Sequence, residues 1–205
     1  MSRILLTAFE PFRGRKGNIS RKNIGLEVSK RIDEKGIAKL LFPVVFDDFR
    51  SEIEYAKSLA PDYVLMLGES GRYSPELEKK AKNLIRCEGS PDDHGRIIDN
   101  APVIKRAPAY YLATLPSYEK MIKMVNKEII KYAGRKGHEI IKSDDAGEYV
   151  CNFLFYKFLH EFRGSKAKVG FLHIPYSMDV NESTDIIYLM LDYLKNDNSG
   201  GNENE

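Results

Sequence analysis

Apolar runs and amphipathic stretches alternate along the chain. Short, mostly apolar runs typical of buried strands lie at 2–9, 39–46, 63–67, 138–142 and directly before His173. Stretches with apolar residues at helical spacing lie at 21–34, 49–59, 117–132, 148–162 and 181–195. This order of elements predicts an α/β fold in a single domain, a three-layer α/β/α sandwich with a mostly parallel, twisted sheet.

A few segments depart from this alternation. Residues 84–102 are polar and predict a loop, and the glycines within 68–71 predict a flexible turn after the third strand. Residues 196–205 are polar and glycine-rich, so we expect a disordered tail after a domain of residues 1–195. Pro43 cannot donate to a sheet ladder and therefore places the second strand near an edge.

Charge and hydropathy limit the partners of the protein. Its 205 residues are 42% hydrophobic, and 32 basic and 30 acidic residues give a formal net charge of +2. Because the two signs are interspersed, neither a nucleic acid nor a membrane surface is an expected partner. No apolar run approaches the roughly 20 residues of a membrane span, and no secretory apolar region follows Met1. We therefore expect a cytoplasmic protein.

The chain has two cysteines, Cys87 and Cys151. There is no C-x-x-C motif and no cysteine–histidine cluster at zinc spacing, and in a reducing compartment both thiols should be free. Cys151 falls within the first turn of the helix predicted at 148–162, where backbone N–H groups and the helix dipole favour a reactive thiolate. The alternative is an inert core cysteine among apolar neighbours.

One of the four histidines is well placed to serve Cys151 as a base. His160 lies on the opposite face of the same predicted helix. His94 lies in a polar run, and His138 precedes its strand instead of following it. His173 ends the next strand, and ligands gather outside the carboxyl ends of parallel strands, at one edge of the sheet. A core histidine that bonds to backbone groups is the alternative.

The segments around these two residues, A-G-E-Y-V-C-N and G-F-L-H-I-P-Y, resemble the two C-terminal signature blocks of pyroglutamyl peptidase I, a family of cysteine peptidases. The resemblance extends over about residues 1–176. It implies a hydrolase that releases an N-terminal pyroglutamyl residue from a peptide without a metal or cofactor. Members of the family often form homodimers or homotetramers, and the sequence does not decide between these assemblies and a monomer.

A third block supplies a candidate acid. The segment G-R-Y-S-P-E-L-E-K-K-A-K-N is similar to the family pattern G-R-x-x-I-T-P-E-R-V-A-I-N, and the catalytic glutamate of the family falls on Glu78. The resemblance therefore implies a triad of Cys151, His173 and Glu78 that forms a thioacyl-enzyme. The alternative for Glu78 is one charge of a solvated run that includes several lysines.

The resemblance also implies a substrate pocket. The segment F-E-P-F, followed by Asn18, is similar to the opening of the family, in which two phenylalanines help to form the pocket for the pyroglutamyl ring. Phe9, Phe12 and Asn18 are the corresponding candidates. Beside the nucleophile, Tyr149 and Val150 are candidates for packing against the ring.

The segment G-E-S-G-R is similar to the family's G-Q-A-G-G-R turn beside the substrate ring. Ring and oxyanion contacts then fall on Glu69 and on the main chain near Ser70. Glu69 stands where the family has Gln; a Gln amide can both donate to and accept from a lactam, whereas an ionised Glu only accepts. A nucleotide site is not expected, because the segment lacks P-loop spacing and Glu69 would repel a phosphate.

Two other functions remain open. Cys151, with Cys87 as its resolving partner, would suit a redox-sensing thiol protein. The departures at Glu69 and at Arg13, where the family has Gly, would suit a catalytically inactive or altered-specificity binding relative of the family.

Overall fold

The computed structural model describes residues 2–12, 22–133 and 137–197. Six strands form the central sheet, in the order β2-β1-β3-β10-β4-β9. Their bounds are Ile37–Phe42 (β2), Ile4–Phe9 (β1), Tyr63–Ser70 (β3), Lys168–Pro175 (β10), Glu76–Glu78 (β4) and Ile141–Ser143 (β9). The first four run parallel, whereas β4 is antiparallel to β10 and parallel to β9. The predicted mostly parallel sheet is confirmed.

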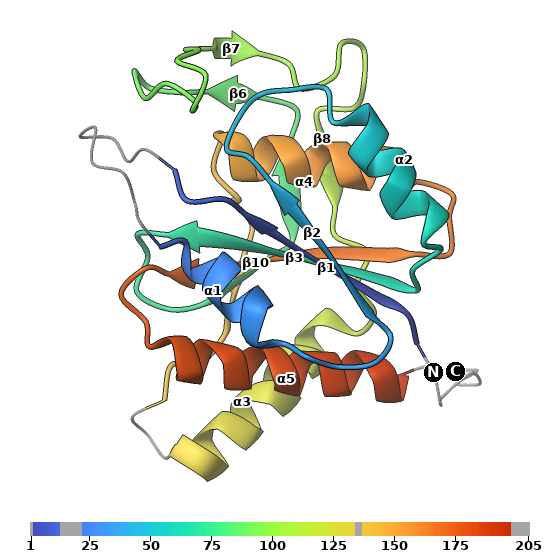
Figure 1. Cartoon of the computed structure of the whole chain (residues 1–205), viewed down its shortest axis with the longest axis vertical. Helices are drawn as coiled ribbons and strands as arrows, with labels where there is room; N and C mark the ends of the chain where they lie inside the picture. Colours follow the sequence, from blue (N-terminus) through green and yellow to red (C-terminus); the bar gives the residue numbers. More distant parts are fainter. Residues whose placement is uncertain (1, 13–21, 134–136, 198–205) are drawn as a thin grey trace.

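Helices cover both faces of this sheet, as Figure 1 shows. One face carries α2 (Arg50–Ser58) and α4 (Val150–Glu161), and the other carries α1 (Ile24–Arg31), α3 (Tyr118–Ala133) and α5 (Val180–Asp197). Alternate side chains of β3 enter two separate cores: Val64 and Met66 pack on the α4 side, and Leu65 and Leu67 pack on the α5 side. The predicted three-layer sandwich is confirmed.

Two small antiparallel sheets accompany α4. β5 (Lys80–Lys82) pairs with β8 (Tyr110–Leu112), and β6 (Ile85–Arg86) pairs with β7 (Asp99–Ala101). The prediction of a loop over 84–102 is therefore wrong near both ends of that segment.

A buried carboxylate organises the middle of the same segment. The side chain of Asp92 accepts hydrogen bonds from the backbone N–H groups of Phe46, His94 and Arg96 and from the Arg96 guanidinium. The polar composition of this segment predicts a solvated loop. Here the Asp92 carboxylate instead bonds to N–H groups of the protein.

β3 runs through to Ser70, so the predicted flexible turn at 68–71 is wrong. The strand continues because β10 pairs with it, with Gly68 opposite His173. Gly68 serves packing here, since a Cβ at this position would lie 2.6 Å from the ring of Phe171. The paired strands therefore carry residues 69 and 70 to the sheet edge that also holds His173.

Two further boundaries differ little from prediction. Among the described strands β2 lies at an edge of the sheet, as predicted, and it ends at Phe42, directly before Pro43. α5 extends to Asp197, into the predicted tail, and 198–205 lie outside the described residues. None of the helices within the described ranges combines the length and the apolar character needed to cross a membrane.

Candidate active site

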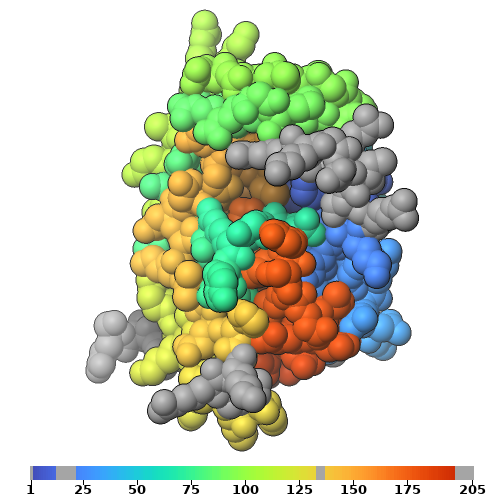
Figure 2. Space-filling model, turned by 90° about the vertical axis from the view of Figure 1, so that its left-hand side faces the viewer, coloured from blue at the N-terminus to red at the C-terminus, as the bar shows by residue number. Residues whose placement is uncertain are grey.

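The carboxyl ends of β3 and β10 meet at one edge of the sheet, and the start of α4 lies beside them. Figure 2 faces this edge: the segments near 70–76, 84–102 and 145–156 meet there, and the surface is hollowed between them. His173 belongs to β10, and Cys151 is the second residue of α4.

Glu78 and His173 form a buried hydrogen-bonded pair. Glu78 Oε1 lies 2.7 Å from His173 Nδ1, and the two side chains are 0% and 6% exposed. Because a carboxylate accepts, Nδ1 carries a proton and Nε2 is left with a lone pair. The alternative of a solvated Glu78 is therefore wrong, as is that of a histidine whose ring bonds only to backbone.

The strand register explains this contact. In the antiparallel pair β4–β10, Phe171 lies opposite Glu78, which makes His173 the diagonal neighbour of Glu78 on the same face. Leu77, between the two glutamates of β4, points to the other face and is fully buried there.

Cys151 is a half-buried free thiol whose surroundings disfavour the thiolate. Burial of the thiol, followed by the charges of Glu78 and Glu69, raises the pKa of Cys151 to about 12, and Arg72 acts in the opposite direction. Desolvation and the two carboxylates therefore act against the thiolate that the helix start favours.

Backbone N–H groups next to the sulfur are available to an anion. Tyr149 is the N-cap of α4, and its side chain does not cap the helix. The N–H of Phe153 is the first to bond within the helix, to the Tyr149 carbonyl at 3.0 Å. The N–H groups of residues 150–152 therefore have no acceptor within α4, an arrangement that favours negative charge.

Three of the predicted pocket residues lie in or against one apolar core. Phe9 is 2% exposed, with its ring centroid 6.4 Å from that of Phe171, and Val150 is fully buried. Phe12 is partly buried against the same core. Asn18 lies outside the described residues.

Tyr149 joins the start of α4 to two other segments. Its ring packs edge-on against Phe46, with centroids 5.5 Å apart, and its hydroxyl donates to the Pro91 carbonyl at 2.8 Å. Tyr149, directly before α4, is thus held by the segment that Asp92 organises.

Glu69 and Ser70 occupy the end of β3. The Glu69 carboxylate accepts from the N–H of Ile24, the first residue of α1, at 2.9 Å. Burial raises the pKa of Glu69, and the hydrogen bond from Ile24 opposes that shift. The Ser70 carbonyl accepts from the N–H of Tyr176 at 2.9 Å, which extends the β3–β10 pairing by one bond.

Asn152, next to Cys151, has a structural role for which no prediction was made. Its side chain is fully buried; its Oδ1 accepts from the Lys82 N–H at 2.8 Å, and its Nδ2 donates to the carbonyls of Lys82 and Leu84 at 2.9 and 3.0 Å. A lone amide among the apolar residues of the first two turns of α4 was the available signal.

The other histidines have partners away from this edge. His160 Nδ1 lies 2.9 Å from the Tyr111 hydroxyl, and His138 Nδ1 lies 3.0 Å from the Glu182 carboxylate. The second cysteine, Cys87, is a buried free thiol whose sulfur accepts from the Ile98 N–H at 3.3 Å. Within the described ranges, no three His, Cys, Asp or Glu side chains are grouped so as to hold a metal ion.

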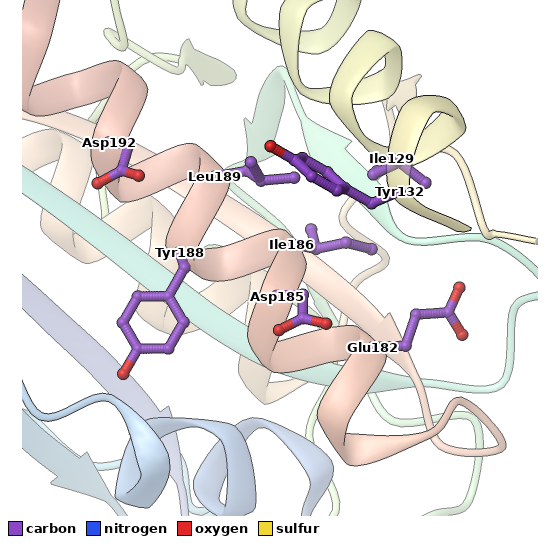
Figure 3. Close-up of a pocket in the computed structure, with 8 residues that line it drawn as sticks. All are labelled: Ile129, Tyr132, Glu182, Asp185, Ile186, Tyr188, Leu189 and Asp192. Carbon is purple, nitrogen blue, oxygen red and sulfur yellow. The ribbon is translucent and has the colours of Figure 1, made fainter. Parts of the chain in front are cut away.

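A separate cavity of about 380 Å³ lies between α3 and α5 (Figure 3). Tyr132 and Ile129 of α3 face Ile186 and Leu189 of α5, and acidic side chains of α5 flank them. Its lining includes no cysteine or histidine, so it offers neither a nucleophile nor an imidazole base.

Comparison with known proteins identifies relatives over nearly the whole chain. The family model described as pyroglutamyl peptidase matches residues 2–186. A pyrrolidone-carboxylate peptidase of Bacillus cereus is 35% identical over 185 residues, which is 86% of this chain and 79% of the relative.

Solved structures agree. The crystal structure of pyroglutamyl peptidase I from Bacillus amyloliquefaciens has a TM-score of 0.80 and 26% identity, and the match covers 93% of this chain and 95% of that one. Pyrrolidone carboxyl peptidase from the hyperthermophile Pyrococcus furiosus has a TM-score of 0.79 and 25% identity, with 95% and 99% covered. On its sequence and its fold, the chain belongs to the pyroglutamyl peptidase family.

Proposed function

We propose that the protein is a cysteine peptidase that removes an N-terminal pyroglutamyl residue from peptides. Cys151 is the nucleophile, His173 the general base and acid, and Glu78 the group that orients the imidazole. The buried hydrogen bond between Glu78 Oε1 and His173 Nδ1 carries this proposal, because it leaves Nε2 as the free basic nitrogen.

The first half-reaction forms a thioester. His173 Nε2 takes the proton of the Cys151 thiol as sulfur attacks the pyroglutamyl carbonyl, and the carbonyl electron pair moves to the oxygen. The N–H groups at the start of α4 stabilise that oxyanion. When the tetrahedral intermediate collapses, the C–N bond breaks and the leaving amine takes the proton from Nε2.

Water completes the cycle. Nε2 removes a proton from water as the water oxygen attacks the thioester carbonyl. Collapse of the second intermediate breaks the C–S bond, releases pyroglutamate and returns the proton to sulfur. A thiol with a raised pKa fits this route, since proton transfer to His173 accompanies the attack and no resting thiolate is required.

The substrate class follows from the pocket candidates. A pyroglutamyl ring is an uncharged lactam, which suits apolar walls such as Phe9 and Phe12 together with a few hydrogen bonds. A free N-terminal amine would need a carboxylate partner. Glu69 supplies a carboxylate at the end of β3. A substrate with an uncharged lactam nitrogen and one with a charged ring amine therefore test which of the two the site accepts.

The test is hydrolysis of a pyroglutamyl-aminocoumarin amide, with the prolyl analogue as the charged control. Wild type and Cys87→Ala should release aminocoumarin from the pyroglutamyl substrate, and Cys151→Ala should not. No turnover by folded wild type, or turnover retained in Cys151→Ala, would contradict the proposal. Preference for the prolyl compound would indicate an altered-specificity relative in which Glu69 binds an amine.

A further inference from the structure

Arg72 lies between the candidate acid and the segment that leads to Cys151. Its Nη1 donates to Glu78 Oε1 at 2.7 Å, to Ser143 Oγ at 3.2 Å and to the carboxylate of Glu76. Its Nη2 donates to the backbone carbonyl of Asp145. One guanidinium therefore joins the end of β3, strand β4 and the connection from β9 to α4.

The charge of Arg72 matters because Glu78 is buried. The Glu78 side chain is 0% exposed, and within the described residues its ion-pair partners are Arg72 and, only when the imidazole is protonated, His173. A buried carboxylate without a cationic partner is strongly unfavourable. Arg72 is 30% exposed and permanently protonated, so it supplies a constant charge that an imidazole, which must gain and lose a proton, cannot supply.

The geometry matters as much as the charge. Glu78 Oε1 receives both the Arg72 and the His173 hydrogen bonds, while Oε2 has no partner among the described residues. Two donors on one oxygen fix the orientation of the carboxylate. They thereby fix the plane of the imidazole and the direction of Nε2.

The forked guanidinium reaches several acceptors that a lysine could not reach together. Nη1 serves the Glu78 carboxylate while Nη2 holds the Asp145 carbonyl, which precedes the nucleophile helix. A Lys ammonium is a point charge on a flexible stem and lacks this planar fork.

We propose that Arg72 is the positioning residue of the site: it fixes the Glu78 carboxylate against His173 and ties this pair to the segment before Cys151. This inference rests on the proposed peptidase function. In this role Arg72 does not contact the substrate. Its loss should therefore lower kcat and disturb the Glu78–His173 pair, and KM should change little.

The experiment compares Arg72→Met and Arg72→Lys. The control is Arg50→Met, which removes an exposed arginine. We expect Arg72→Met to lower kcat about 100-fold through misplacement of the base, with KM near the wild-type value. Arg72→Lys should recover part of the loss, and Arg50→Met should behave as wild type. A normal kcat in folded Arg72→Met would overturn the proposal.

A second readout does not depend on turnover. The proton shared by His173 Nδ1 and Glu78 should give a downfield ¹H resonance in wild type, assigned by its absence in His173→Gln. It should be lost or shifted in Arg72→Met and retained in Arg50→Met. An unchanged resonance in Arg72→Met would reject the positioning role, whereas inactive wild type with the expected spectral change would reject the peptidase function alone.

Should Arg72→Met fail to fold, Ser143→Ala provides the milder test. It removes one acceptor of Nη1 and leaves the triad candidates in place. A smaller fall in kcat together with a shift of the same resonance would support the proposal. Wild-type behaviour of both Ser143→Ala and Arg72→Lys would contradict it.

Discussion

Glu78 and His173 meet diagonally across the antiparallel pair β4–β10, at a distance of 2.7 Å between Oε1 and Nδ1. On its other side β10 pairs with β3, which runs parallel to it, so the carboxylate beside His173 comes from the short antiparallel strand β4. The acid–base pair is therefore a product of strand direction as well as of residue type.

Glu78→Gln tests the role of that carboxylate. Gln keeps the volume of Glu and its oxygen can still accept from Nδ1, but the negative charge that stabilises an imidazolium is lost. We expect kcat/KM on the pyroglutamyl amide to fall about 100- to 10,000-fold with the fold retained. Glu76→Gln is the matched control, since Glu76 also bonds to Arg72 but not to His173; equal losses in both variants would contradict the assignment.

The thiol of Cys151 should react slowly below its raised pKa. Alkylation by iodoacetamide, measured in a Cys87→Ala background, should still increase above pH 9, because thiolate forms only as pH approaches about 12. Since the charge of Glu69 raises this pKa, Glu69→Gln should lower it and accelerate alkylation at pH 8, roughly two- to fivefold. Glu139→Gln, at an exposed position, should have no effect; a rate that levels off near pH 7 would reject this account.

Asn152→Ala should lower both stability and turnover. The substitution leaves backbone groups of Lys82 and Leu84 without their buried partner, and we expect a loss of about 2–4 kcal/mol in the free energy of unfolding. Asn126→Ala is matched, because Asn126 also bonds to both backbone groups of one residue, Ile140, but lies on α3. Denaturant unfolding should show losses in both variants, and kcat should fall only in Asn152→Ala.

Asp92 should make the fold sensitive to acid. Burial raises the pKa of Asp92, but hydrogen bonds from Phe46 and Arg96 and the charge of Arg96 outweigh burial, so the pKa is lowered overall. A carboxyl whose pKa is lower in the folded state stabilises the fold above its unfolded pKa of about 3.9, and this contribution is lost as pH falls through the folded value.

Asp92→Asn should therefore cost about 1–3 kcal/mol of unfolding free energy at pH 7. The difference from wild type should shrink below pH 4. The exposed Asp192→Asn is the control, and it should follow wild type at every pH. A difference between Asp92→Asn and wild type that stays constant from pH 7 to pH 3 would contradict the linkage.

Sequence patterns were sufficient where local spacing and sheet topology decide the structure. The helix predicted at 117–132 is α3, Tyr118–Ala133, because its apolar stripe is long and regular. The rule that carboxyl ends of parallel strands converge also placed His173 at the sheet edge where β3 ends.

Patterns failed where a distant strand decides the environment. Glu76–Glu78 has one apolar residue between two acids, and lysines follow it, so nothing local indicates burial. Pairing with β10 supplies the burial, and the resemblance to a family was needed to single out Glu78. The pKa of Cys151 likewise depends on Glu69 and Glu78, which only the folded sheet places near the sulfur.

β10 lies inside the sheet, between β3 and β4, yet among the described strands it comes last in the sequence. A growing chain that has emerged through α4 already contains the thiol and the acid, but the base and the strand that buries Glu78 are still missing. Pairings between such distant segments form late, because a long loop must close first. A chain that has not yet added β10 would therefore carry Cys151 and Glu78 without the imidazole that we propose as their partner.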